Sequence, residues 1–280
     1  MPRLTKGIRS IAGRVAIVTG AASGMGRAFA ERFGALGMNV VLADVEEPRL
    51  VEVAASMRED GVEVLPVVTD VADGASIDAL AAKAFDTFGA VHVLCNNAGV
   101  GGGGPMAELT TNDWQWVIGV NLWGVIHGIR AFLPTMLASG EEGHIVNTAS
   151  MAGMIAGPMM GPYNATKFAV VAISETLNAE LALSGGKIGV SVLCPGFVNT
   201  DITTSARNRP ASLSGRDFTP DPEQAASFKA LLEAGRQPAE VALMVEAAIR
   251  ERRLHIFTDR EFLPVFETRV QGIVDAFPAG

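Results

Sequence analysis

Short runs of apolar, mostly β-branched residues alternate along this chain with longer segments that have the period of an α-helix. Such alternation is typical of parallel sheets whose strands are joined by helices. The runs are apolar throughout, as expected for strands covered by helices on both faces. Because crossovers between parallel strands are right-handed, the sequence predicts an α/β fold with a doubly wound parallel sheet. The expected strands are residues 15–19, 40–43, 62–68, 91–95, 145–148, 190–194 and 254–257.

The chain shows no internal repeat and no linker rich in serine, proline or glycine in its first two thirds, so we expect a single domain over residues 1–280. At residues 201–237, prolines and arginines interrupt any regular pattern. A long irregular excursion of this kind is typical of a mobile substrate lid. A helix is expected to resume over residues 239–250. Residues 259–280 are predicted to form a C-terminal tail helix, with its helical part at 261–277.

Two predicted helices, residues 114–137 and 168–183, are apolar on more sides than a surface helix needs. The sheet can cover one face of each. A neighbouring subunit is the natural cover for the other face. We therefore expect a homo-oligomer, either a homodimer or a homotetramer.

Composition excludes several classes of protein. With 49% hydrophobic and 19% charged residues, the chain has ample material for a buried core. A formal net charge of -8 would repel the phosphates of nucleic acids and anionic lipid head groups, so neither nucleic acid nor a membrane is an expected partner. Residues 1–14 lack the apolar run of an export signal. No metal site is expected, because the 4 His and 2 Cys are scattered.

The two cysteines, Cys95 and Cys194, each end an apolar run. We expect them to be small core residues rather than a disulfide, since that is the commoner role of an isolated cysteine in such a run. This cysteine usage is typical of a reducing compartment and predicts a cytoplasmic protein.

A glycine-rich turn follows the first predicted strand and opens a helix. There Gly20 permits a tight turn, Gly24 lets the backbone approach a pyrophosphate, and Gly26 allows close packing of helix on strand, with the helix N-terminus facing the anion. This position favours a dinucleotide site over a chance cluster among the 31 glycines. The cofactor-binding residues expected here are Gly20, Ser23, Gly24, Met25 and Gly26.

Asp44 ends the second predicted strand, where a carboxylate would accept hydrogen bonds from the adenosine ribose hydroxyls. Its charge would repel the 2'-phosphate of NADP, and neither Val45 nor Ser23 supplies the cation that NADP usually requires. The predicted cofactor is therefore NAD. The alternative is that Asp44 caps a helix starting near Glu46.

Two further segments are candidates for cofactor contact. Asp70, followed by Val71, lies at the end of the third predicted strand and could reach the adenine amino group or cap the helix of residues 75–88. The fourth strand runs into a glycine-rich turn where main chain can approach the cofactor, although a flexible surface loop is the alternative. The residues expected to contact the cofactor in that turn are Asn97, Ala98 and Gly99.

Tyr163 and Lys167 lie four residues apart in a helical segment, so their side chains share a face. A phenol has an ordinary pKa of about 10, too high for a base at neutral pH. An ammonium at roughly 4 Å would stabilise the phenolate by about 4 kcal/mol, roughly three pKa units before desolvation opposes it. The pair therefore predicts an acid/base for proton transfer. The alternative is an ordinary helix pair.

Two polar residues fit the same chemistry. Ser150 ends the fifth strand, at the sheet edge where ligands bind in doubly wound folds, and its hydroxyl could hold a substrate oxygen. Asn121 lies among apolar neighbours in a predicted helix, and its amide needs a specific partner, such as a proton-relay water near Lys167. The alternative for Ser150 is an ordinary turn residue, and the alternative for Asn121 is a buried amide whose hydrogen bonds are satisfied.

Together and in this order, these motifs resemble the short-chain dehydrogenase/reductase superfamily. The resemblance covers about residues 12–200 and rests on residues 19–26, 96–99, Asn121, Ser150, 163–167 and 195–200. It implies a Rossmann fold and a catalytic tetrad of Asn121, Ser150, Tyr163 and Lys167. Lys167 would also bind the nicotinamide ribose. The residues implied to embrace the nicotinamide are Pro195, Gly196, Val198 and Thr200.

The C-terminal part departs from the common pattern of that superfamily. The last predicted strand continues into Thr258, Asp259 and Arg260, not into the glycine-rich ending that many members show. Because of this departure, the resemblance says less about how subunits would assemble and which substrate would bind. What it implies about hydride transfer is unchanged.

Apolar side chains that follow Ser150 or flank Tyr163 predict an adaptable apolar pocket. The residues expected to bind substrate are Met151, Met160 and Phe197, with core packing as the alternative for the methionines. In the lid, Arg207 and Arg209 could recognise an acidic group or could be solvated.

The sequence thus predicts an NAD-dependent enzyme that moves a hydride between a hydrophobic secondary alcohol, aromatic ones included, and its ketone. An NADPH-dependent ketoreductase is the alternative of the same class. A non-catalytic nucleotide-binding regulator on the same fold is the alternative of another class.

Overall fold

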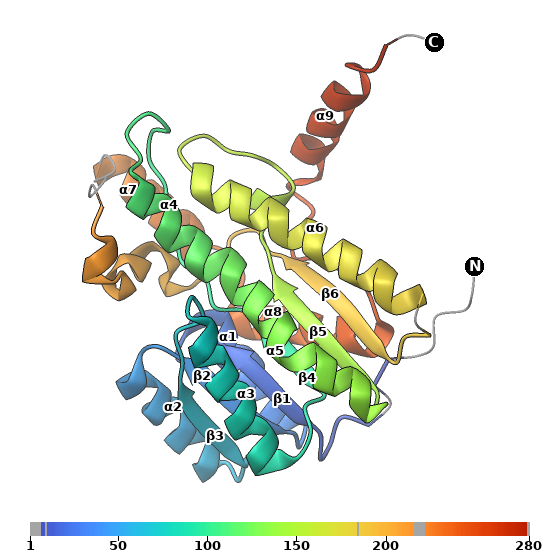
Figure 1. The fold of residues 1–280 in the computed structure, drawn as a ribbon. Helices are drawn as coiled ribbons and strands as arrows, with labels where there is room; N and C mark the ends of the chain where they lie inside the picture. The colour runs from blue at the N-terminus through green and yellow to red at the C-terminus, as the bar shows by residue number, and fades with distance from the viewer. Residues whose placement is uncertain (1–6, 9, 184, 216–221, 279–280) are drawn as a thin grey trace.

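The computed structural model describes residues 7–8, 10–183, 185–215 and 222–278. One seven-stranded sheet lies at its centre, in the order β3-β2-β1-β4-β5-β6-β7, and all neighbouring strands are parallel (Figure 1). The predicted doubly wound sheet is confirmed. The strands are β1 (Val15–Thr19), β2 (Asn39–Asp44), β3 (Val64–Val68), β4 (Val93–Asn96), β5 (Gly143–Thr148), β6 (Ile188–Cys194) and β7 (His255–Phe257).

Helices cover both faces of the sheet, as the uniformly apolar strands require. Successive residues of a strand point to opposite faces. Ala16 and Val18 of β1 pack in one core cluster with α1, α2 and α8, whereas Val15 and Ile17 pack in another with α3, α5 and α6. These helices are α1 (Gly24–Ala35), α2 (Glu47–Glu59), α3 (Gly74–Phe88), α5 (Gly124–Ser139), α6 (Gly161–Leu183) and α8 (Pro238–Glu251).

The predicted strands agree with the observed ones to within a few residues, and β1 agrees at both ends. The third was predicted to begin at residue 62 but begins at Val64, and it contains Pro66. Proline is tolerated there because β3 is an edge strand, so no neighbour requires its missing N–H. Both cysteines are free and buried in strands, which confirms their prediction as core residues.

The helix predicted over residues 114–137 is interrupted. Helix α4 (Thr111–Ile118) passes into a π-helical turn (Gly119–Trp123) before α5 begins. The run Thr111–Ser139 is long and apolar enough to span a membrane, with a hydropathy of 1.3 in its most apolar window. It packs on the sheet and α3, and His127 and Arg130 bond carbonyl oxygens of the segment before and at the start of α3, although only 39% of that window is buried.

The expectation of an irregular segment over residues 201–237 was wrong in part. The chain there forms two 3-10 helices (Asp201–Asn208 and Ala211–Leu213) and helix α7 (Pro222–Glu233), while residues 216–221 lie outside the described residues. Pro222 opens α7, where a proline's missing N–H is not needed, so a residue that suggested a break marks a helix start. A tail helix, α9 (Leu263–Val274), is present, buries none of its residues and extends away from the body (Figure 1).

Helix α6 is buried on one face within a single chain, the face that the sequence assigned to the sheet; the other face was assigned to a neighbouring subunit. Its inner residues, among them Val170, Ser174 and Leu177, recur at helical spacing. The exposed apolar side chains of the neighbouring helices include Trp123 and Leu137. The homodimer or homotetramer, and the single domain, stay predictions.

Candidate active site

The carboxyl ends of the parallel strands meet at one edge of the sheet. The strand order reverses between β1 and β4, so the turns after these two strands diverge and leave a crevice, the usual ligand site of such folds. The segments after β1, β2, β4, β5 and β6, which carry the predicted site residues, all lie at this edge.

The glycine turn has the geometry that the sequence predicts. Gly20 and Gly24 have φ angles of 70° and 53°, which favour glycine. A Cβ on Gly26 would lie 2.0 Å from the carbonyl oxygen of Gly20, so only glycine lets α1 approach this turn. Ser23 is the N-cap of α1, and its hydroxyl makes no capping hydrogen bond. The turn thus offers helix N–H groups, unopposed by an acidic residue in the first turn, to an anion.

Asp44 ends β2 beside that turn. Its Oδ2 accepts a hydrogen bond from Ala22 N at 2.9 Å, and its Oδ1 accepts one from Glu46 N at 3.0 Å. The second bond is a turn contact before α2 (Glu47–Glu59), whose N-cap is Glu46, so Asp44 does not itself cap that helix. Because each carboxylate oxygen can accept more than one hydrogen bond, the partly buried carboxylate still has acceptor capacity for ribose hydroxyls.

Asp70 does not cap α3. The N-cap is Asp73, whose side chain accepts from Ala75 N, whereas Asp70 accepts from Ala72 N at 2.9 Å. Its side chain is exposed. Val71 is buried in a core cluster and packs against Gly124, the first residue of α5.

The turn after β4 is held by Thr19, the last residue of β1. The hydroxyl of Thr19 accepts hydrogen bonds from the backbone N–H groups of Asn97 at 2.9 Å and Ala98 at 3.0 Å. A Cβ on Gly99 would lie 3.4 Å from Asn121 Oδ1 and 3.6 Å from Lys167 Nζ. This is therefore an ordered turn beside the predicted tetrad, not a flexible surface loop.

Ser150 and Tyr163 meet. Ser150 follows β5, starts a short 3-10 helix as its N-cap, and accepts a hydrogen bond from Ala152 N at 3.1 Å. Its hydroxyl also hydrogen-bonds the phenol of Tyr163, which lies in the first turn of α6. Two hydroxyl groups are thus held together where a substrate oxygen could bind both.

Lys167 is buried, with 3% of its surface exposed. Its Nζ donates to the carbonyl oxygen of Thr148 at 2.9 Å and lies 5.5 Å from the centroid of the Tyr163 ring. Burial lowers the pKa of Lys167 to about 8, although the nearby thiol of Cys194 acts in the opposite direction. The helical spacing therefore does bring the ammonium to the phenol.

The expected lowering of the Tyr163 pKa does not follow from the protein's own groups. Burial raises the pKa of Tyr163 above its ordinary value, and the hydrogen bond from Ser150 offsets only part of that rise. The ammonium of Lys167 bonds the Thr148 carbonyl and lies beside the ring, so it does not cancel the desolvation of the phenolate.

Asn121 lies in the π-helical turn and is 1% exposed. Its Oδ1 accepts from Val100 N at 2.8 Å and its Nδ2 donates to Val100 O at 2.9 Å. This backbone pair makes Asn121 the satisfied buried amide named as its alternative. Asn121 thereby fixes the end of the turn that carries Gly99.

The segment after β6 closes the other side of the crevice. Pro195 is buried, and its carbonyl oxygen accepts from Met151 N at 2.9 Å, which ties this segment to the one after β5. A Cβ on Gly24 would lie 3.1 Å from the Thr200 methyl group, so Thr200 reaches the glycine turn. Gly196 and Val198 lie between these two anchor points.

A sequence model of the family described as short chain dehydrogenase matches residues 14–211. The chain belongs to the short-chain dehydrogenase family. Members of this family are oxidoreductases that bind a nicotinamide cofactor and act on alcohols or ketones.

Three proteins similar to this chain illustrate the members of the family that it resembles. A crystal structure of a short chain dehydrogenase/reductase from Burkholderia phymatum in complex with NAD is 45% identical, with a TM-score of 0.91 and coverage of 98% of this chain and 99% of that one. A C alpha-dehydrogenase from Sphingobium sp. strain SYK-6 is 34% identical over 264 residues, 94% of this chain and 86% of its own length. An actinorhodin polyketide ketoreductase with NADPH is 35% identical, with a TM-score of 0.74 and coverage of 88% and 95%.

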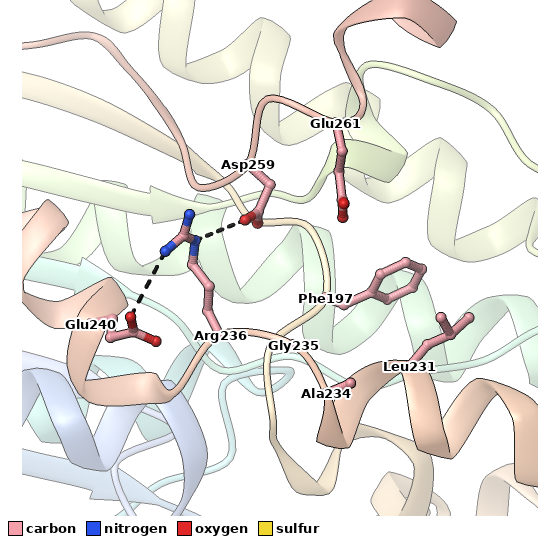
Figure 2. A pocket seen from close by; sticks show the side chains of 8 residues that line it. All are labelled: Phe197, Leu231, Ala234, Gly235, Arg236, Glu240, Asp259 and Glu261. Carbon is pink, nitrogen blue, oxygen red and sulfur yellow. Dashed lines mark hydrogen bonds and ion pairs between the residues drawn. The ribbon is translucent and has the colours of Figure 1, made fainter.

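The predicted substrate residues of this short-chain dehydrogenase differ in environment. Met151 is buried in a core cluster with Val170 and Val192, which fits its alternative as core filler. Met160 is partly exposed. Phe197 packs against the rings of Phe228 and Phe262 and lines a pocket of about 440 Å³ (Figure 2). The pocket is lined by Phe197, Leu231, Ala234, Gly235, Arg236, Glu240, Asp259 and Glu261.

Several residues that shape the site of the dehydrogenase were not singled out by sequence reasoning. Thr19 belongs to the glycine motif, which could have identified it, but Thr148 acts through its backbone carbonyl and leaves no sequence signal. In the lid, both arginines form ion pairs: Arg207, which is exposed to solvent, with Glu46, and the half-buried Arg209 with Asp113. Ion pairs between distant segments have no local pattern.

Lys167 predicts a stability that depends on pH. Because burial lowers its folded-state pKa from 10.5 to about 8, the unfolded chain holds a proton between these values that the folded chain has lost. This group therefore makes the fold more stable as pH rises through that window. Between pH 7 and pH 10 we expect the difference in unfolding free energy between wild type and Lys167→Met to shift towards wild type by about 1–3 kcal/mol.

Urea unfolding of both proteins at several pH values measures this shift, because other titrating groups cancel in the difference. Lys83→Met, at an exposed position of α3, gives the baseline. Parallel pH profiles for wild type and Lys167→Met would show that the pKa of Lys167 is not lowered.

Proposed function

We propose that this protein is an NAD-dependent oxidoreductase that transfers a hydride between a hydrophobic secondary alcohol and its ketone. The observation that carries the proposal is the meeting of Ser150, Tyr163 and Lys167. Two hydroxyl groups are hydrogen-bonded, and a buried ammonium lies against the phenol ring. This arrangement suits proton transfer at an alcohol oxygen.

The glycine turn is the part of the crevice suited to a dinucleotide. A Cβ on Gly20 would lie 2.9 Å from Ala98 Cα and one on Gly24 would lie 3.1 Å from the Thr200 methyl group, so these glycines let the segments after β1, β4 and β6 pack closely around the N-terminus of α1. Pyrophosphate would lie at the N-terminus of α1 near Ser23, and ribose hydroxyls would lie at Asp44. The nicotinamide end would lie between Gly99 and the segment of Gly196 to Thr200, with Lys167 near its ribose.

Each of the three residues has a definable task in alcohol oxidation. The bound nicotinamide supplies the acceptor for a hydride from the carbinol carbon. Tyr163, as phenolate, takes the proton of the alcohol, and Ser150 donates a hydrogen bond to the substrate oxygen as its charge develops. Lys167 stabilises the phenolate electrostatically, because its charge is buried and screened little by water. In ketone reduction Tyr163 returns the proton.

The substrate class is proposed from the apolar surroundings. Arg236, Glu240, Asp259 and Glu261 make part of the pocket in Figure 2 charged. Phe197 and Leu231 give one side of it an apolar surface, and Met160 is partly exposed. Such side chains favour an aromatic, alicyclic or steroid-like alcohol. The name C alpha-dehydrogenase of one relative is compatible with a secondary carbinol.

Two other functions compete with this one. A ketoreductase that uses NADPH has a structural relative in the NADPH-bound ketoreductase, but a carboxylate at Asp44 opposes a 2'-phosphate. A regulator that only binds the nucleotide would have no need of a phenol held between a serine and a buried lysine.

Tyr163→Phe tests the reaction. Loss of the phenolic proton acceptor should lower kcat by about 10²- to 10⁴-fold, whereas the Kd for NAD should stay within about twofold, because no adenosine contact changes. Turnover is followed by absorbance of the reduced cofactor, with NAD or NADP and a panel of aromatic, alicyclic and steroidal secondary alcohols. Residual activity of more than a few per cent would remove Tyr163 from its role, and NAD binding without turnover of any alcohol by wild type would favour the regulator.

Asp44 tests the cofactor. Replacing Asp44 by Ala and Val45 by Arg removes the charge that repels the 2'-phosphate and adds one that attracts it. We expect the ratio of kcat/KM for NAD over NADP to fall by at least about tenfold, equivalent to about 1.4 kcal/mol. The single variant Val45→Arg is the control. An unchanged ratio would exclude Asp44 as the residue that selects NAD.

The lid role of residues 201–237 is proposed from its contacts with the cofactor side. Glu46 Oε1, next to the turn of Asp44, accepts from Arg207 Nη2 at 2.6 Å and Asn208 Nδ2 at 2.8 Å. Burial disfavours ionisation of Glu46, but these partners outweigh it and hold its pKa below the ordinary value. These bonds join the lid to the adenosine end of the crevice, so cofactor exchange should require them to open.

Glu46→Ala should therefore accelerate release of NADH. Loss of two hydrogen bonds to a charged carboxylate predicts an increase of about three- to tenfold in the dissociation rate, measured by stopped-flow fluorescence. Glu47→Ala, at the exposed neighbouring position, is the matched control. Equal rates in both variants would argue against a lid held at this point.

A further inference from the structure

Arg236 lies where the last turn of the lid meets the segment that follows β6. Its backbone N–H donates to Phe197 O at 3.0 Å, and its carbonyl accepts from Asn199 N at 2.9 Å. A Cβ on Gly235 would lie 2.3 Å from Phe197 O, so the two segments are in close backbone contact. The lid therefore ends directly on the segment proposed to hold the nicotinamide.

The side chain of Arg236 turns back towards the residues after β7. Its Nε donates to Thr258 O at 2.8 Å. The same Nε donates to Asp259 Oδ1 at 2.8 Å, and Nη1 lies 3.9 Å from Glu240 Oε1 (Figure 2). Asp259 has 17% of its side chain exposed. A charged pair in such a position is stronger and better oriented than one in open solvent.

The other oxygen of Asp259 continues this chain of contacts to the main chain of the site. Asp259 Oδ2 accepts from Thr258 Oγ1 at 2.5 Å, and Thr258 Oγ1 accepts from Gly196 N at 2.9 Å. A hydroxyl has one proton to donate, so the bond to Asp259 leaves its lone pairs directed at Gly196. Thr258 is 4% exposed, so water does not readily replace either partner.

We propose that Arg236, Asp259 and Thr258 are positioning residues that fix Gly196, and with it the nicotinamide, for hydride transfer. The clasp, as we name these three residues, also anchors the lid end, so it links lid position to nicotinamide position. A Cβ on Gly196 would lie 2.5 Å from the Phe262 ring and 2.9 Å from Asp259 Oδ2, so the segment is pressed against the clasp. The proposal rests on the proposed function, because it assigns the nicotinamide to this segment.

The clasp uses Thr258 and Asp259, which directly follow β7. A glycine in either place would supply neither the hydroxyl nor the carboxylate. Arg236 is more than twenty positions away from Thr258 and Asp259 in the chain. Its backbone nevertheless contacts the segment after β6, and its side chain contacts Asp259. A buried network of hydrogen bonds favours one arrangement of its side chains, because only in that arrangement are all its donors and acceptors paired.

Thr258→Val and Thr258→Ser form the test pair. Valine keeps the shape and removes the hydroxyl, whereas serine keeps it. We expect Thr258→Val to lower kcat by about tenfold or more, as a misplaced reacting group does, with a larger kinetic isotope effect for the carbinol-deuterated alcohol and a Kd for ADP-ribose within about twofold of wild type. Thr258→Ser should restore kcat and the isotope effect. Arg260→Ala, at an exposed neighbouring position, is the control.

A second measurement does not depend on turnover. The fluorescence of bound NADH reports the surroundings of the nicotinamide, and it should change in Thr258→Val and in Asp259→Asn but not in Thr258→Ser or Arg260→Ala. If wild type binds NADH and turns over no alcohol, the proposed function fails, whereas the fluorescence still decides whether the clasp positions the nicotinamide. A Thr258→Val protein with wild-type kcat, isotope effect and bound-NADH fluorescence would overturn the proposal. Asp259→Asn serves as the deciding variant if Thr258→Val does not fold.

Discussion

All seven strands run in one direction, and the chemistry of this protein depends on that constraint. Parallel strands place every carboxyl end at one edge of the sheet, so residues far apart in the chain emerge side by side. Thr19, Asp44, Ser150 and Pro195 each end or follow a different strand. Because the strand order reverses between β1 and β4, the segments after these two strands diverge and leave a crevice. The N-terminus of α1, the carboxylate of Asp44 and the hydroxyl groups of Ser150 and Tyr163 are brought to this crevice by different segments.

Burial sets the electrostatics of the site. It lowers the pKa of Lys167 to about 8 and raises the pKa of Tyr163, so each group is disfavoured in its charged form when considered alone. An ammonium and a phenolate together have no net charge, and each then supplies the other with part of what water would have supplied. The Thr148 carbonyl accepts a hydrogen bond from the ammonium and holds it beside the phenol ring.

The sequence predicts those parts of the site that arise from local geometry. The glycine turn follows from the backbone approach of α1 to Gly20, and the pairing of Tyr163 with Lys167 follows from helical spacing. Contacts between distant segments leave no such pattern, which is why the bond of Glu46 to Arg207 and that of Thr258 to Gly196 became visible only in the structure. Met151 shows a further reason, because a methionine that lines a pocket and one that fills a core have the same sequence signature. Pro222 lacks a backbone N–H, which is tolerated in the first turn of a helix and would break a helix farther along. Whether it starts or breaks a helix therefore depends on where the helix begins.

The edge strands also limit how copies of this chain can meet. At one edge, Pro66 removes a donor from β3, and at the other edge β7 has only three residues. A sheet with such edges offers little regular unpaired backbone to a strand from another molecule, which protects it from edge-to-edge aggregation. Growth of the sheet across a subunit boundary is thereby discouraged, and the exposed apolar side chains on helices include Trp123, Leu137 and several residues of α9.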